Sequence, residues 1–176
     1  MVSNEEILVN KRNGRGKEAL QIDKIHAMVG FATDGITGVS ASHVEMNSGI
    51  QLFDGISTAD IQQILIKSAN DLITLESPNY QYVAARLLLF SLRKQLFHRL
   101  WDHPKLIDHI KKLIDMGLYD KDILVNYDES EIDRMNMWID HERDYNFTYA
   151  GLRQVMDKYL VQDRSTGEIF ETPQFM

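Results

Sequence analysis

The order of apolar and polar positions predicts a mainly helical chain with a short β-hairpin near each end. Near the start, the apolar runs 7–9 and 19–22 flank a segment that contains Asn13-Gly14 and a second glycine at position 16. Such residues accept positive φ, which tight hairpin turns require. Near the other end, 159–161 and 169–170 flank Ser165-Thr166-Gly167 in the same way.

Between these hairpins, apolar residues recur at helical spacing. Asp23 is expected to cap a first helix, and Ser42 with Glu45 has the form of a capping box for a second. Ser57 or Thr58 can cap a third helix, which runs to about residue 73. Pro78 then precedes a long helix whose segment 82–100 is apolar on most sides. We expect this long helix to be the centre of a first core.

The periodic pattern breaks at 101–104, which predicts one domain over 1–100 and another over 101–176. In the second domain, helices are expected over 106–116 and over 148–159. Asp128 and Glu131 have capping-box spacing, and the apolar positions after them predict a helix that continues to about Arg143. The fold class predicted from these elements is α+β, mainly α with small β-hairpins.

Composition narrows the classes of function. The net charge of −7 argues against a general nucleic-acid binder, which needs a basic surface. The absence of cysteine excludes disulfides, thiolate metal sites and thiol chemistry within these 176 residues. The start of the sequence has no signal-peptide pattern, and its longest apolar run is far shorter than a membrane span. We therefore expect a cytoplasmic protein that binds neither a membrane nor nucleic acid.

The strongest local lead for chemistry is the basic glycine turn. Lys11, Arg12, Arg15 and Lys17 lie within seven residues of an otherwise acidic chain, and Gly16 lies among them. Glycine lets backbone amides approach phosphate oxygens, and the cations neutralise the phosphate charge. The segment has neither Walker A nor dinucleotide-binding spacing. An exposed hairpin turn with solvated charges has the same pattern, so both interpretations stay open.

Arg93-Lys94 is a second lead, because a cation on a mostly buried helix needs a partner or must extend to the surface. These side chains could face a bound phosphate or lie in water at a helix end. The histidines at 98, 103, 109 and 141 lack metal-ligand spacing, so no metal site is expected. No nucleophile motif is present either, and no catalytic residue is predicted.

Several ordered stretches of this sequence resemble the N-terminal part of the large (alpha) subunit of class I ribonucleotide reductase. The resemblance covers almost the whole chain. The stretches are Val9–Gly14 with Ile22–Ile25, Asp54–Ile61, Pro78–Leu87, Asp140–Asp144, Lys158–Val161 and Thr166–Phe175.

The resemblance implies an ATP-cone domain, a four-helix bundle covered by a small β-hairpin sheet, followed by a helical segment that ends in a hairpin and begins the reductase body. Such a cone binds ATP or dATP as an allosteric effector, with Mg²⁺ expected beside it and no tightly bound cofactor. By motif position, the nucleotide-binding residues are Lys11, Arg12, Arg15, Gly16, Lys17, Lys24, Thr58, Asp60, Arg93 and Lys94. Gln62 and Ser91 depart from the family, since histidines stand there in some relatives.

The resemblance also implies a function and partners. The chain would be an allosteric segment of the enzyme that makes deoxyribonucleotides. The catalytic remainder of the large subunit would supply the barrel and the reactive cysteines, and a small subunit would generate the radical. A hetero-oligomer is therefore expected, and one half of a split large subunit is one interpretation of this chain. Two alternatives remain: a free-standing ATP-cone regulator, and a vestigial cone that acts only as a structural interaction module.

Overall fold

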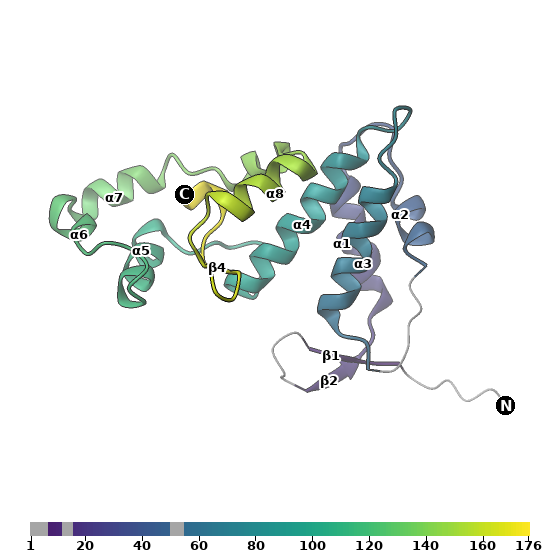
Figure 1. Ribbon diagram of the computed structural model, residues 1–176, viewed down its shortest axis with the longest axis horizontal. Helices are drawn as coiled ribbons and strands as arrows, with labels where there is room; N and C mark the ends of the chain where they lie inside the picture. The colour runs from purple at the N-terminus through teal and green to yellow at the C-terminus, as the bar shows by residue number, and fades with distance from the viewer. Residues whose placement is uncertain (1–6, 12–15, 50–54) are drawn as a thin grey trace. The chain divides into compact units, whose positions relative to one another are not determined.

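The computed structural model describes residues 7–11, 16–49 and 55–176 and is mainly helical, with 58% of residues in helices (Figure 1). Its strands form small antiparallel pairs, so the predicted α+β class is confirmed. The chain divides into two compact units. The first contains residues up to Ser91 together with Phe147–Ala150, and the second contains Leu92–Asn146 with Gly151–Met176. The predicted boundary at residue 100 stays a prediction.

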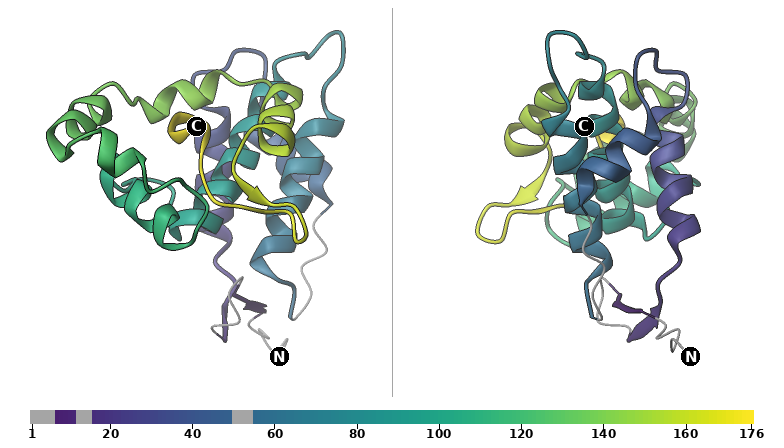
Figure 2. Two further views of the ribbon diagram at one scale, coloured as in Figure 1. Left: turned by 60° about the vertical axis from the view of Figure 1, so that its left-hand side comes forward. Right: turned by 90° about the vertical axis from the view of Figure 1, so that its right-hand side faces the viewer.

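The first unit contains one hairpin and a bundle of helices. Its elements are β1 (Leu8–Asn10), β2 (Lys17–Ala19), α1 (Ile22–Thr33), α2 (Ala41–Ser48), α3 (Thr58–Asp71) and the greater part of α4 (Tyr80–Phe97). Figures 1 and 2 both show the β1–β2 hairpin beyond one end of α1 and α3. The hairpin and the starts of these two helices therefore lie at the same end of the unit.

Apolar side chains at helical spacing form the core of this unit. Val29, Leu65, Val83 and Leu87 have no measurable exposure, and they come from three different helices. Burial of each such side chain contributes about 1.5–3 kcal/mol relative to leaving it in water. α4 is buried on most sides, which agrees with the central position expected from its nearly continuous apolar sequence.

Polar side chains connect the helices through backbone carbonyls. Ser68 Oγ on α3 donates to the Val44 carbonyl of α2 at 2.6 Å, and Arg86 on α4 donates to the Asp34 carbonyl after α1 at 2.6 Å. These carbonyls lie at or near helix ends or beside a neighbouring helix, where a side-chain donor compensates for lost water. The contacts fix α3 against α2 and α4 against the end of α1.

The second unit contains shorter elements. They are α5 (Leu106–Asp115), α6 (Ile123–Asn126), α7 (Glu129–Asn136), the 3₁₀ helix η1 (His141–Asn146), α8 (Tyr149–Lys158), β3 (Gln162–Asp163), β4 (Glu168–Ile169) and the 3₁₀ helix η2 (Pro173–Phe175). The last turn of α4 also belongs to it, and Tyr149-Ala150 of α8 belong to the first unit. The hairpin expected near residue 165 is confirmed as β3–β4, with Gln162 opposite Ile169.

In this second unit, α5 packs against α7 through Ile107, Ile110 and Ile132. The backbone N–H of Leu106 donates to Asn136 Oδ1 at 2.8 Å, which joins the start of α5 to the end of α7. The capping box expected at the start of α7 is confirmed. Asp128 Oδ1 accepts from the Glu131 N–H at 2.9 Å, and Glu131 Oε2 accepts from the Asp128 N–H.

Three details of the predicted elements were wrong. The helix that begins after Asp128 ends at Asn136, not at Arg143, because η1 follows as a separate 3₁₀ turn whose first carbonyl, at His141, accepts from a side chain on α4. The return strand of the first hairpin is 17–19, so Ile22 already belongs to α1, whose cap is Gln21 and not Asp23. Ser42 does not cap α2, because the helix starts one residue earlier.

Candidate functional site

Strand β1 has hydrogen-bonded neighbours on both sides. On one side it pairs antiparallel with β2, with Val9 opposite Glu18. On the other side, the Asn10 N–H donates to the Ile56 carbonyl at 3.0 Å, and Asn10 Nδ2 donates to the Gly55 carbonyl at 2.6 Å. A parallel bridge joins Asn10 to Ser57. The strand that leads into the basic turn is therefore fixed to the residues that lead into α3.

This arrangement brings two predicted site residues to the same place. Lys11 follows Asn10, and Thr58 follows Ser57, so both lie one residue beyond the parallel bridge. Gly55 has φ of +89°, a backbone conformation that favours glycine, and its N–H donates to the Leu8 carbonyl at 2.8 Å. Glycine at this position lets the 55–57 segment follow β1 closely. The basic hairpin and the head of α3 consequently form one surface.

Lys11 of the hairpin is paired with a carboxylate. Lys11 Nζ lies 2.8 Å from Glu18 Oε2, and both side chains are partly exposed. The hydrogen bond from Lys11 lowers the pKa of Glu18, and the charge of Lys24 on α1 acts in the same direction. Lys11 and Lys24 therefore both lie near Glu18. Sequence reasoning missed Glu18 because an acidic residue in a strand has no distinguishing pattern by itself.

The start of α3 is capped by its own side chains. Ser57 Oγ accepts from the Asp60 N–H at 3.0 Å and donates to Asp60 Oδ2 at 2.6 Å. The prediction that Ser57 or Thr58 caps this helix is confirmed for Ser57. Thr58 is the first helical residue, where the positive end of the helix dipole favours an anion. The Asp60 carboxylate lies in the first turn of α3 and already interacts favourably with this end of the helix dipole.

The departure at Gln62 has a structural consequence. Gln62 is one turn after Thr58 on α3, it is 2% exposed, and its Nε2 donates to the Leu87 carbonyl of α4 at 2.9 Å. Ser91, the second departure, is one turn after Leu87 and is also buried. Gln62 thus holds α3 against α4 next to the candidate site.

The other predicted residues of the basic turn are only partly described. Arg12 and Arg15 lie outside the described residues. Gly16 has φ of +97°, as the hairpin turn requires, and its carbonyl accepts from the Lys11 N–H at 3.1 Å. Lys17 is exposed and stands opposite Asn10 in the β1–β2 ladder. A backbone hydrogen bond therefore joins the two described residues, Lys11 and Gly16, that flank the rest of the basic segment.

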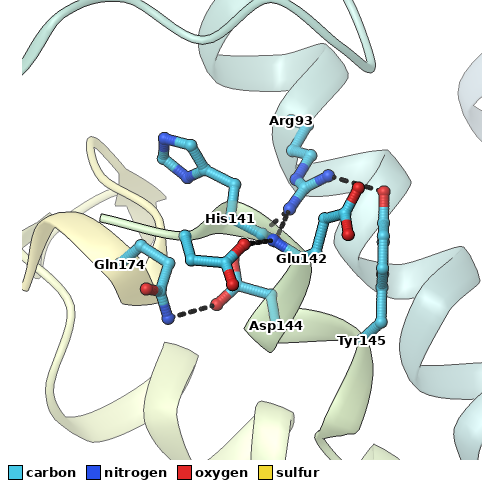
Figure 3. Close-up of polar contacts among 7 residues, drawn as sticks. Arg93, His141, Glu142, Asp144, Tyr145 and Gln174 are labelled. Carbon is cyan, nitrogen blue, oxygen red and sulfur yellow. Dashed lines mark hydrogen bonds and ion pairs between the residues drawn. The ribbon is translucent and has the colours of Figure 1, made fainter. Parts of the chain in front are cut away.

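Arg93 and Lys94 belong to the second unit, and Arg93 is engaged within it (Figure 3). Its side chain is 1% exposed. Nη1 donates to Tyr145 Oη at 2.9 Å, Nη2 donates to the His141 carbonyl at 2.6 Å, and Nη2 lies 3.5 Å from Asp144 Oδ2. This guanidinium holds η1 to the end of α4. Its predicted role in nucleotide binding stays a prediction, as does that of the half-buried Lys94.

In the described part of the chain, no three His, Asp or Glu side chains are grouped so that they could hold a metal ion. None of its helices combines the length and the apolar character that crossing a bilayer requires.

Comparison with known proteins agrees with the geometry of the first unit. Residues 7–95 match the family described as the ATP cone domain. This match spans half of the chain and includes the hairpin, α1, α2, α3 and nearly all of α4. The chain belongs to the ATP-cone family.

The similarity extends beyond the cone. The chain is 47% identical over 173 residues to ribonucleoside-diphosphate reductase 1 subunit alpha of Escherichia coli K12, which covers 98% of this chain and 22% of that relative. The alpha subunit of Haemophilus influenzae is also 47% identical, over 98% of this chain and 23% of its own length. The alpha subunit of phage T4 is 41% identical, over 96% of this chain and 22% of its own length. The chain therefore spans about a fifth of the length of these relatives.

Proposed function

We propose that this chain is the nucleotide-sensing N-terminal segment of a ribonucleoside-diphosphate reductase large subunit. In this proposal ATP or dATP, with Mg²⁺, binds at the basic hairpin and the head of α3. The observation that carries it is the bridge between Asn10 and Ser57, which keeps Lys11 next to the start of α3. Family membership over residues 7–95 supports the same ligand class.

The chemistry of the surface suits a triphosphate. Lys11 and Lys24 supply positive charge from two elements, and Thr58 supplies a hydroxyl and a helix N-terminus. Arg12, Arg15 and Lys17 would add charge from the turn. A phosphate would compete with Glu18 for Lys11 and would be repelled by Asp60, so Mg²⁺ would favour binding by shielding that carboxylate.

The proposed role is allosteric and not catalytic. The chain has no cysteine, so the reduction that the relatives are named for would take place in a catalytic remainder of the large subunit, with a small subunit as a further partner. Nucleotide would act by binding one assembly or conformation more tightly than another, by about 1–3 kcal/mol. A vestigial cone is the second candidate, because Lys11 is already paired with Glu18.

Calorimetry with ATP and with dATP in the presence of Mg²⁺ tests nucleotide binding. We expect saturable binding that Lys11→Ala weakens by about tenfold or more, since it removes a charged hydrogen-bond donor. Lys67→Ala is the matched control, because Lys67 lies near the other end of α3 and pairs with Asp71. No heat and no thermal shift at millimolar nucleotide would instead favour the vestigial cone.

Co-expression with the missing catalytic portion of a reductase tests the second half of the proposal. We expect a stable complex with reductase activity that neither part has alone. Recovery of two separate proteins without activity would contradict the proposed assembly, and it would leave the calorimetric result on nucleotide binding unaffected.

A further inference from the structure

An aromatic cage in the second unit holds the side chain of Phe175. The ring of His109 is stacked on Phe175 with centroids 4.3 Å apart, and the rings of His141 and Phe97 meet it edge-on at 5.0 and 6.3 Å. The ring of His103 does not belong to this set of contacts with Phe175 but is stacked on the ring of His141, with centroids 3.7 Å apart. Phe175 is 7% exposed as a result. Three imidazoles therefore surround or support one phenyl ring.

Hydrogen bonds hold the residues next to Phe175. Gln174 Nε2 donates to Asp144 Oδ1 at 3.1 Å, and Figure 3 shows this contact beside Arg93. Glu171 accepts from the Val161 N–H at 2.8 Å and from the Tyr119 hydroxyl. Residues 171–175, called the latch segment below, are mostly buried although they contain only one short 3₁₀ turn. Their position depends on these side-chain contacts and not on a helix or sheet of their own.

We propose that the latch segment is docked by neutral imidazoles and is released when acidification lets those imidazoles bind protons. Released, the segment would uncover Phe175 and the cage, while α5 and α7 stay folded. This conformational device is independent of nucleotide binding.

The atoms around the three rings favour the neutral form. Nε2 of His103, Nε2 of His109 and Nδ1 of His141 are buried without a hydrogen-bond partner among the described residues. A proton on any of these atoms would leave a charged donor unpaired, which is strongly unfavourable in a buried place. Direct stacking of His103 on His141 also places two like charges in contact if both rings are protonated.

The charged groups near the cage act mostly in the same direction. Burial is the main cause that lowers the pKa of His103 to about 3, and His141, Arg93 and Arg99 add to it. Burial and Arg93 likewise lower the pKa of His141 to about 4, with a small opposing effect from Asp140.

For His109, burial followed by the charges of Lys112 and His141 lowers the pKa to about 4. Two carboxylates lie near the cage: Asp144, which faces the latch segment, and Glu171, which belongs to it. Asp144 is already occupied by Arg93 and Gln174, and Glu171 is occupied by Tyr119 and Val161. They are therefore poorly available to balance a histidine charge.

The sign of the pH effect follows from linkage. An exposed imidazole has a pKa near 6.5, so the released state binds protons below that pH while the docked state does not. Each histidine that gains a proton on release raises the release equilibrium by up to about tenfold per pH unit between pH 6.5 and its docked pKa. Docking is thus fully favoured above pH 6.5 and is lost as pH falls toward 4.

A fluorine label on the whole 176-residue chain tests the proposal. The sequence has no cysteine, so Met176→Cys, at an exposed position next to Phe175, takes a single trifluoromethyl probe at neutral pH. We expect the fluorine signal to change from the docked to the released form between pH 6.5 and 4, more steeply than for one proton, with unchanged far-ultraviolet circular dichroism. A fluorine change that coincides with loss of helical signal would overturn the latch.

Variants keep the test decisive. His109→Phe retains an aromatic stack but cannot bind a proton, so the transition should shift to lower pH and become less steep. Gln174→Ala removes the bond to Asp144 without touching the rings, so release should shift to higher pH. His26→Gln, in the first unit, is the control and should leave the midpoint of the fluorine transition unchanged. An unchanged midpoint in Gln174→Ala or in folded His109→Phe would each contradict the proposal.

Discussion

The guanidinium of Arg93 lies 3.5 Å from the carboxylate of Asp144, and at most 1% of either side chain is exposed. Burial raises the pKa of Asp144, although the hydrogen bond from Gln174 and the charge of Arg93 oppose that rise. The raised pKa indicates that desolvation outweighs the attraction between the two charges. The pair therefore matters chiefly because each charge would be strongly unfavourable alone.

Removing one partner of this pair should lower the free energy of unfolding of the second unit by more than the net stabilisation that the ion pair provides. We expect Asp144→Ala to lower the free energy of unfolding by about 3 kcal/mol, since it leaves Arg93 buried without a counter-charge. Urea unfolding followed by tryptophan fluorescence measures the change. The double variant Arg93→Met with Asp144→Leu should be less destabilised than Asp144→Ala, and the reverse order would refute the explanation.

Two serines at the starts of helices provide a matched comparison. Ser57 caps α3 through its side chain, whereas Ser40 precedes α2 without a side-chain cap. Ser57→Ala should therefore lower the free energy of unfolding of the first unit by about 1 kcal/mol, and Ser40→Ala should have a smaller effect. Chemical denaturation of both variants checks this difference. Equal losses would contradict an extra contribution from the side-chain cap of Ser57.

His26 and Glu45 join α1 to α2 with a pH dependence opposite to that of the cage. His26 Nδ1 lies 2.7 Å from Glu45 Oε1, and this hydrogen bond raises the pKa of His26. The stabilisation is fully present below pH 6.5 and is lost as pH rises through the raised pKa. An NMR titration of the His26 ring should show a lower pKa in Glu45→Gln. An unchanged His26 pKa in this variant would mean that Glu45 does not cause the rise.

Tyr119 lies on a short loop, yet its hydroxyl should contribute substantially to the free energy of unfolding. Its hydroxyl donates to the buried Glu171 carboxylate, and burial is the main cause that raises the pKa of Tyr119. Tyr119→Phe leaves Glu171 with the Val161 N–H and should lower the free energy of unfolding by about 2 kcal/mol. Tyr127→Phe removes the same atom from an exposed side chain and serves as the control in the same denaturation experiment.

Local signals in the sequence predicted much of the fold. The capping box at Asp128 and the cap at Ser57 were confirmed because both depend on residues three positions apart. The predicted end of α7 was wrong because the apolar pattern continues past Asn136, although the chain there leaves the helix and forms η1, whose His141 carbonyl accepts from Arg93, 48 residues earlier in the chain. Periodicity carries no information about such a partner.

The candidate site was predictable to a smaller extent. Basic residues and glycines marked the hairpin turn, and the start of α3 was marked by its capping residue. The connection between them was not, because it consists of backbone bonds from Asn10 to Gly55 and Ile56. The side-chain partners of Arg93 were also hidden, because nothing in the sequence marks Asp144 and Tyr145 as contacts of a residue about 50 positions earlier.

The bond between Asn10 and Gly55 joins residues 45 positions apart, which has a consequence for how the first unit forms. Closing a loop of this length costs entropy that only later contacts repay, whereas the β1–β2 hairpin and the helices form through neighbours in the sequence. The hairpin should therefore attach to residues 55–57 late during folding. Its amide at Asn10 should also exchange with deuterium sooner than the amides of α4, through local opening that spares the helical core.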